Sequence, residues 1–231
     1  MTQIVLLHGS WLGSWAWSEV ASRLAENGHP VLAPDFSSSG GMNTHRGELT
    51  GMIDSGEIET GAILVAHSYA GMPATAATVD RPGAIAKIIY LDAYVPRGEQ
   101  CAFDILPDLR AAFEAMATED GYVLPLPLTA FGISDPEMAA WIESKLRPWP
   151  LATHTETAPG VPESVETAFI QLAAGHFFDV LATELDDAGW TVERADLAHL
   201  APLTHPAETA ELLLQHCREV GTRHDFVTDR R

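Results

Sequence analysis

An apolar run that stops at a histidine–serine pair constrains the fold of this chain more than any other stretch. Residues 61–80 read GAILVAHSYAGMPATAATVD. The run at 63–66 is continuously apolar with β-branched side chains, which is typical of a strand buried on both faces of a parallel sheet. Small residues at 70–79, followed by Pro82, favour a helix packed closely on that sheet. The stretch therefore predicts a strand, a sharp turn with Ser68 at its tip, and a helix.

This order of elements is the geometry of a nucleophile elbow, in which a strained turn exposes a serine hydroxyl above the sheet. The usual pattern is Gly-x-Ser-x-Gly, but residues 66–70 read AHSYA and the next glycine is Gly71. Glycine serves there because strand and helix approach closely, a demand that alanine also meets, while the strained backbone belongs to the serine. We therefore interpret Ser68 as the candidate nucleophile.

Two other interpretations of the stretch compete with the elbow. One is an ordinary strand–helix turn that contains a buried serine. The other is a membrane-spanning helix, because residues 61–79 are nearly uncharged and long enough to span a bilayer. His67, Pro73 and many Ala and Thr residues leave that segment little hydrophobic weight at its centre, which argues against the membrane helix.

The length and composition predict a single domain. A chain of 231 residues, 46% of them hydrophobic, can bury one sizeable core and lies within the range of one α/β domain over 1–231. The N-terminus has no basic region, signal-length apolar stretch or cleavage site, so we expect a cytoplasmic protein. Cys101 and Cys217 are then expected to be free thiols.

The charge balance bears on the partners of the protein. The chain has 13 Lys and Arg residues against 32 Asp and Glu residues, a formal net charge of −19. This excess of acid repels a phosphate backbone, so we expect no nucleic-acid partner. We also expect no membrane association, and we predict a small-molecule substrate; nothing in the sequence indicates an oligomeric state.

Strand-like and helical stretches alternate along most of the chain, which is typical of a parallel sheet with right-handed crossovers. Ser14 can cap the first helix, and Gly28 and Pro30 end it. Asp35 lies in a Ser- and Gly-rich loop, and we assign it to loop structure. The expected strands are 4–7, 31–33, 63–66, 86–91, 168–173 and 190–194. The expected helices are 14–28, a part of 43–59, 70–79, 178–188 and 206 to about 220.

The segment from about 97 to 162 departs from this alternation. Eight prolines divide it into short pieces, and helical periodicity occurs only around 108–118 and 135–146. We interpret it as a cap inserted over the carboxyl ends of the strands, where open α/β sheets bind ligands, rather than as sheet. The charged tail at 221–231 is expected to fray.

A serine nucleophile needs a base within hydrogen-bond reach, and histidine is the usual one. In the elbow fold the acid and then the histidine follow the serine, with the histidine in the loop after the last strand. That loop, residues 195–206, reads ADLAHLAPLTHP and contains His199 and His205. We take His199 as the base, because His205 directly precedes the predicted helix start and suits a capping or surface position.

Five stretches together resemble the small α/β-hydrolases of the branch that holds bacterial esterases, plant methylesterases and hydroxynitrile lyases. They are VLLHGSWLGSWAW at 5–17, PVLAPDF at 30–36, AHSYAG at 66–71, IYLDAYVP at 89–96 and HLAPLTHP at 199–206. The resemblance covers nearly the whole chain and implies the α/β-hydrolase fold with a reduced, mainly parallel sheet of about six strands. It also implies an oxyanion hole formed by the backbone N–H groups of Ser10 and Tyr69.

The third member of the triad departs from the family pattern. The family usually places the acid just beyond the penultimate strand, but residues 173–178 read AAGHFF with no carboxylate before Asp179. The other location known in the superfamily is the end of the strand after the elbow helix, where Asp92 stands. Burying an aspartate is costly unless it is paired or hydrogen-bonded, which favours a functional or bracing role. We predict that Asp92 orients His199, with loop bracing as the alternative and Asp179 and Asp196 as reserves.

These residues predict hydrolysis of a small carboxylic ester or lactone through an acyl-enzyme, with Ser68 attacking and His199 relaying the proton. No cofactor or metal is required. Hydroxynitrile lyases of this branch carry a lysine directly after the catalytic histidine, where this chain has Leu200. A non-catalytic binding protein on the same scaffold is the alternative from another class, since the acid is missing from its usual place.

Aromatic residues are the candidates for lining the substrate pocket. Trp11 and Tyr94 are predicted to bind substrate, and Tyr69 is a further candidate. Four aromatic residues of the cap are equally suited to cap core and to substrate contact: Phe103, Phe131, Trp141 and Trp149.

Overall fold

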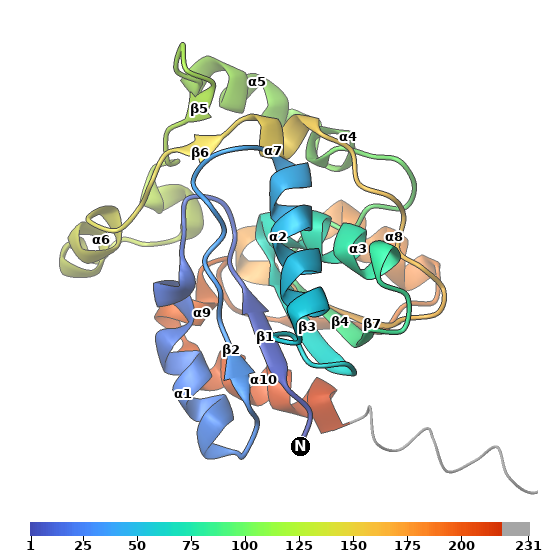
Figure 1. The fold of residues 1–231 in the computed structure, drawn as a ribbon. Coiled ribbons are helices and arrows are strands. Elements are labelled where there is room, and N and C mark those ends of the chain that lie inside the picture. The colour runs from blue at the N-terminus through green and yellow to red at the C-terminus, as the bar shows by residue number, and fades with distance from the viewer. Residues whose placement is uncertain (219–231) are drawn as a thin grey trace, which may run out of the picture.

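The computed structural model describes residues 1–218, in which six strands form one parallel sheet at the centre of the fold (Figure 1). The strand order is β2-β1-β3-β4-β7-β8, and every neighbouring pair is parallel. The strands are β1 (Ile4–Leu7), β2 (Val31–Leu32), β3 (Ala62–His67), β4 (Ile85–Leu91), β7 (Glu166–Leu172) and β8 (Val192–Ala195). The predicted α/β-hydrolase sheet of about six strands is therefore confirmed.

Helices cover both faces of the sheet (Figure 1). Ile63 and Val65 of β3 belong to the apolar cluster shared with α1 (Ser18–Glu26) and α10 (Pro206–Arg218). Leu64 and Ala66 belong to the cluster on the other face, because successive side chains of a strand point to opposite faces. The helices on that second face are α2 (Met42–Ser55), α3 (Gly71–Asp80) and α8 (Asp179–Asp187).

The first predicted helix begins later than expected. A short 3-10 helix, η1 (Ser14–Trp17), precedes α1, and the Ser14 side chain caps neither of them. The Ser14 hydroxyl instead donates to the Asp35 carboxylate at 2.9 Å, so the capping role is wrong. The predicted end of the last helix near residue 220 and the predicted fraying of 221–231 lie outside the described residues.

The segment between β4 and β7 lies above the carboxyl ends of the strands (Figure 1). Its β5 and β6 form a small antiparallel pair, so the expectation that this segment contains no sheet is wrong. The segment contains α4 (Ala102–Ile105), α5 (Asp108–Met116), β5 (Tyr122–Val123), η3 (Leu128–Phe131), α6 (Pro136–Glu143), β6 (Trp149–Pro150) and α7 (Ala152–Thr155). Its role as a cap over 97–162 of a single domain stays a prediction.

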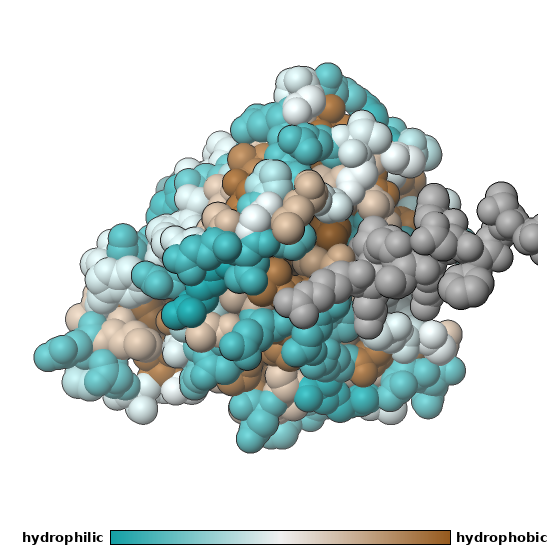
Figure 2. All heavy atoms as spheres, turned by 90° about the horizontal axis from the view of Figure 1, so that it is seen from below, coloured by the Kyte–Doolittle hydropathy of each residue, from teal (hydrophilic) through white to brown (hydrophobic). Residues whose placement is uncertain are grey.

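The face of the molecule opposite this segment carries hydrophilic side chains, with hydrophobic atoms visible between them (Figure 2). Within residues 1–218, no helix combines the length and the apolar character needed to cross a bilayer. Cys101 and Cys217 are both buried and both free, as predicted.

Candidate active site

Ser68 lies at the turn that joins β3 to α3. Its φ is 56°, in the left-handed region that side chains other than glycine rarely adopt, so the predicted strained backbone at the serine is confirmed. A 3-10 turn, η2 (Ser68–Ala70), then leads directly into the helix. The Ser68 side chain stays partly exposed, whereas both of its chain neighbours are buried.

The close approach expected around the elbow occurs at Gly71. A Cβ added there would lie 1.9 Å from the backbone oxygen of Tyr94, a distance that no real side chain tolerates. The alanines at positions 66 and 70 are both fully buried. The elbow therefore needs glycine at one position, and alanine suffices at the two positions where the usual pattern has glycine.

His199 contacts Asp92 in the buried interior beside the elbow. The His199 Nδ1–Asp92 Oδ2 distance is 2.6 Å, and the Leu172 N–H donates to Asp92 Oδ1 at 3.1 Å. Asp92 follows β4 with a φ of 45° and is 0% exposed. A carboxylate oxygen accepts in this contact, so His199 Nδ1 is the donor and Nε2 is the ring nitrogen that the contact does not use.

The reserve acids lie elsewhere. Asp179 accepts hydrogen bonds from the Gln171 amide at 2.5 Å and from the exposed His176 ring at 2.9 Å. Asp196 is exposed and makes no side-chain hydrogen bond within residues 1–218. The rival base His205 is also exposed and bonds only the neighbouring Thr204 hydroxyl through its ring. Of the predicted acids, the structure brings Asp92 alone to His199.

Ser68 and His199 line the same pocket. Within residues 1–218 the Ser68 hydroxyl makes no hydrogen bond to the His199 ring, which is common in free enzymes because catalytic hydrogen bonds tighten when substrate binds. The roles of Ser68, His199 and Asp92 therefore stay predictions, supported by their common location.

The His67 side chain contacts His199, and this contact was not predicted from the sequence. Its Nε2–H donates to the His199 backbone oxygen at 2.8 Å, and the two ring centroids are 4.7 Å apart. Burial lowers the pKa of His67 well below its usual range, and the His199 ring lowers it further. His67 is therefore neutral, so it adds no charge that would oppose protonation of His199.

The loop after β1 packs against the nucleophile. A Cβ added to Gly9 would lie 2.8 Å from Ser68 Cβ and 3.3 Å from Ser68 Oγ, so the loop backbone lies directly on the serine. The next residue, Ser10, is buried and lines the pocket. The oxyanion role of the Ser10 and Tyr69 amides stays a prediction.

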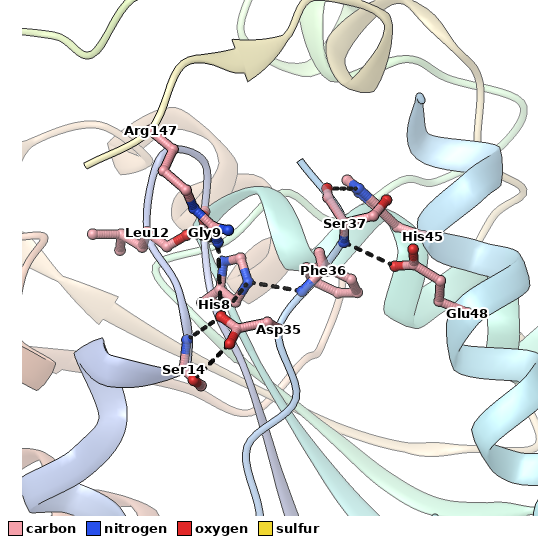
Figure 3. A network of polar contacts seen from close by, with 10 residues as sticks. All are labelled: His8, Gly9, Leu12, Ser14, Asp35, Phe36, Ser37, His45, Glu48 and Arg147. Atoms are coloured by element: carbon pink, nitrogen blue, oxygen red, sulfur yellow. Dashed lines mark hydrogen bonds and ion pairs between the residues drawn. The ribbon is translucent and has the colours of Figure 1, made fainter. Parts of the chain in front are cut away.

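A network of polar contacts holds this loop in place (Figure 3). His8 Nε2 accepts from the Phe36 N–H at 3.0 Å, and its Nδ1–H donates to the Gly9 oxygen at 2.9 Å. Burial lowers the pKa of His8 to about 4, so the ring stays neutral and fills both roles. Asp35 accepts from the Ser14 N–H at 2.7 Å, which confirms its predicted structural role.

Tyr69 is fixed by the second half of that network. The Tyr69 hydroxyl donates to His45 Nδ1 at 2.8 Å. His45 Nε2–H in turn donates to the Ser37 oxygen at 2.9 Å (Figure 3). Ser37 N–H in turn contacts Glu48 of α2 at 3.3 Å. The Tyr69 ring is fully buried and is not among the residues that line the pocket, so its predicted contact with substrate is wrong.

The predicted pocket-lining residues divide into two groups. Trp11 and Tyr94 line the pocket, and so does Phe131 of the cap aromatics. Trp141 is exposed and packs on Trp15. Phe103 and Trp149 are buried but do not line the pocket.

Most of the other lining residues were missed, because the proline-broken segment has no period that marks an inner face. None of the residues that line this pocket is Lys, Arg, Asp or Glu. Nowhere in residues 1–218 do three or more His, Cys, Asp or Glu side chains gather so that they could hold a metal ion. The missed lining residues include Leu106, Leu109, Phe113, Leu126, Leu128, Leu146, His154, Phe177 and Phe178.

Comparisons with known proteins agree with this geometry. The model of the "Alpha/beta hydrolase family" matches residues 4–212. The chain is 28% identical over 240 residues to a carbendazim hydrolyzing esterase from a Nocardioides species, covering 92% of this chain and 98% of the relative. It is 35% identical over 105 residues to methylesterase 4 of Arabidopsis thaliana, covering 41% of this chain and 40% of that protein. Tomato methylketone synthase I, solved with 2-tridecanone, has the same fold, with a TM-score of 0.78 and 19% identity over 95% of this chain and 98% of that chain.

Proposed function

Since this chain belongs to the alpha/beta hydrolase family, we propose that it is a serine hydrolase that cleaves a small carboxylic ester or lactone through an acyl-enzyme. Ser68 is the nucleophile, His199 the general base and Asp92 the residue that orients the histidine. The observation that carries this proposal is the 2.6 Å contact between His199 Nδ1 and the fully buried Asp92 carboxylate, beside a serine with left-handed backbone.

The protonation state of His199 gives the first chemical step its direction. With Nδ1–H donated to Asp92, the Nε2 lone pair takes the Ser68 proton as the hydroxyl oxygen attacks the carbonyl carbon. The buried carboxylate stabilises the imidazolium that forms, and the neutral His67 behind it adds no opposing charge. His199 then returns the proton to the leaving alcohol, and water repeats the sequence to release the acid.

The carbonyl oxygen becomes negative in both transition states and needs donors that are already in place. The backbone N–H groups of Ser10 and Tyr69 fill this role in the proposal. Gly9 supports it, because the loop backbone lies against Ser68. The His8 and Asp35 contacts hold that loop rigid.

The pocket favours a small, uncharged substrate. Its lining contains no Lys, Arg, Asp or Glu, and leucine and phenylalanine side chains predominate. Many of these side chains come from the segment at 97–162, which we propose acts as the cap that shapes the substrate site. The relatives named as an esterase and a methylesterase support ester hydrolysis as the reaction.

The two rival functions find less support. The residue after His199 is Leu200, which is buried and lines the pocket, so no cation stands where a hydroxynitrile lyase carries one. A binding protein without activity would not need a buried carboxylate on the histidine, because removing water from a charge is costly unless it serves a partner.

A fluorophosphonate probe tests the nucleophile directly. We expect the wild type to be labelled on Ser68 and to hydrolyse members of a panel of short esters, methyl esters and lactones. Ser68→Ala should lose labelling and about 10⁶-fold in kcat. His199→Ala should lose activity by a similar factor, because triad members act as a unit. His205→Ala is the matched control and should remain active; full activity of Ser68→Ala would end the proposal.

A further inference from the structure

His154 has a defined tautomer that places a hydrogen-bond acceptor in the apolar pocket. The Thr153 hydroxyl donates its only proton to the Pro150 oxygen at 2.6 Å, and Thr153 Oγ1 lies 2.8 Å from His154 Nδ1. With its proton already given to the carbonyl, the Thr153 oxygen can only accept from the ring. His154 therefore carries its proton on Nδ1, and Nε2 holds a lone pair.

This Nε2 atom has no partner within residues 1–218. The His154 ring makes its one hydrogen bond through Nδ1, although the residue is only 2% exposed. Its ring lines the pocket that holds Ser68, and Nε2 is not among the buried polar atoms that are both unpaired and fully enclosed. The unused lone pair therefore faces the pocket.

The surroundings of the ring keep it neutral and fixed. Tyr69 stacks on His154 with ring centroids 5.5 Å apart, and Phe113 and Phe103 lie at 4.7 and 5.5 Å. Burial among these rings lowers the pKa of His154 to about 3. The group is thus an uncharged acceptor held by aromatic packing, adjacent to the residue that follows the nucleophile.

Every other lining residue that comes from the segment at 97–162 is Leu, Phe or Pro, so His154 is the one polar side chain on the cap side of the pocket. The Trp11 indole N–H is already donated to the Val123 oxygen at 3.0 Å. His199 is committed to Asp92 through one ring nitrogen and, in the proposed reaction, to Ser68 through the other. A substrate whose hydrogen-bond donor faces the part of the pocket lined by residues 97–162 therefore finds its acceptor at His154.

We propose that His154 Nε2 accepts a hydrogen bond from the substrate, so that the enzyme prefers esters whose non-reacting part carries an O–H or N–H donor. A substrate without a donor leaves this acceptor buried and unpaired, which costs affinity. This inference rests on the proposed ester hydrolysis at Ser68, and it names the substrate class of that site and a residue that determines specificity.

The tautomer can be measured on the wild type without any substitution. Nitrogen-15 NMR of the histidine rings should show the proton on Nδ1 of His154 and none on Nε2 at pH 7. In the Ser68→Ala protein, which holds the ester without cleaving it, the Nε2 resonance should shift with methyl hydroxyphenylacetates. It should not shift with the matching methoxy esters. A proton found on Nε2 would overturn the proposal.

Turnover provides the second test. The 2-, 3- and 4-hydroxyphenylacetate methyl esters are compared with their methoxy counterparts and with methyl phenylacetate. In wild type, kcat/KM for the best hydroxy ester should exceed that of its methoxy partner by about tenfold or more, the size of one hydrogen bond. His154→Phe keeps an aromatic ring and should remove that preference while methyl phenylacetate is still hydrolysed. His205→Phe, outside the pocket, should keep the preference.

The two proposals fail in different ways. If His154 plays no part, wild type and His154→Phe will both label with fluorophosphonate and hydrolyse methyl phenylacetate, but the hydroxy preference will be absent or unchanged by the substitution. If Ser68 is not the nucleophile, the probe will not label Ser68, and Ser68→Ala will not lower turnover. The NMR measurement of the His154 tautomer does not depend on either result.

Discussion

The pocket has two sides that are built in different ways. The sheet side consists of the elbow, Asp92, His199 and the loop at 8–14, and the cap side consists of the segment at 97–162. Within residues 1–218 four non-glycine residues have positive φ; three of them, Trp11, Ser68 and Asp92, lie on the sheet side, and none lies between residues 97 and 162. The sheet side is held by backbone geometry and polar contacts, and the cap side by side-chain packing.

From this difference we expect the sheet side to determine reactivity and the cap side to determine substrate selectivity. Atoms that move protons must be placed to within a few tenths of an ångström, and strand ends with hydrogen-bonded loops provide such placement. Apolar lining residues need only fill space, and volume-conserving exchanges among them are tolerated. Substitutions on the two sides should therefore have different effects.

The largest difference is expected at Asp92. Asp92→Asn keeps the size of the side chain but removes the charge that, in the proposed mechanism, fixes the tautomer of the neutral His199 ring and then stabilises the imidazolium. We expect kcat to fall by about 10⁴-fold with the melting temperature little changed. Asp179→Asn is the matched control, because Asp179 bonds only Gln171 and His176, and it should retain activity. A less stable but fully active Asp92→Asn enzyme would make Asp92 a loop brace.

Gly71 tests how rigid the sheet side is. Gly71→Ala places a Cβ on the Tyr94 backbone oxygen, and this overpacking should cost about 3 kcal/mol in the free energy of unfolding. Gly47→Ala is the matched control in α2, where an added Cβ meets nothing within 4 Å; it should stabilise by up to about 1 kcal/mol. Urea unfolding of both variants measures the contrast. Equal stability of the two would mean that the elbow can relax.

Both sides contain buried neutral histidines, so acid should destabilise the fold. Burial lowers the pKa of His8 to about 4 and that of His154 to about 3 from the ordinary value of 6.5. Below 6.5 the unfolded chain binds protons that the folded chain does not, so stability is lost as the pH falls from about 6.5 toward 4. Each histidine contributes a slope of up to about 1.4 kcal/mol per pH unit.

The His154→Phe variant isolates the contribution of His154 to that slope. Urea unfolding between pH 4 and pH 6.5 should show a slope lower than that of wild type by about 1.4 kcal/mol per pH unit around pH 5. The remainder comes from the other groups whose pKa is lowered in the folded protein, which include the buried His8 and His67 of the sheet side. An unchanged slope would mean that His154 is charged in the folded protein.

The smallest effect is expected for apolar residues of the cap side. Leu126 lines the pocket, and Leu126→Ala should change the ratio of kcat/KM for a bulky and a short ester by about tenfold with kcat on the short ester nearly unchanged. Leu124→Ala is the matched control, because Leu124 is 49% exposed and does not line the pocket. A large loss of kcat on the short ester would show that the cap also positions the catalytic groups.

The same division decides what the sequence could predict. Buried parallel strands produce continuous apolar runs in the sequence. The alternation of strands and helices, the elbow and the position of Asp92 at the end of a strand could therefore be predicted. Ser14 was misassigned because its partner Asp35 lies 21 residues away, a contact that no local capping pattern encodes. His67 and His154 were missed because their functions depend on which ring nitrogen is free, and this depends on tertiary contacts. The leucines of the cap side have no regular spacing in the sequence, so those that line the pocket could not be distinguished from those that pack in the core of the cap.

The ladder between β4 and β7 joins parts of the chain that are far apart in sequence. Leu172 and Asp92 are separated by 80 residues and His199 and Asp92 by 107. During synthesis the carboxylate therefore leaves the ribosome long before its histidine, at about 5–20 residues per second. Closing such long loops carries an entropic cost that local helices do not carry. A growing chain can form its elbow early, but the proposed triad is complete only after the last sheet strand and the loop that carries His199 have been added.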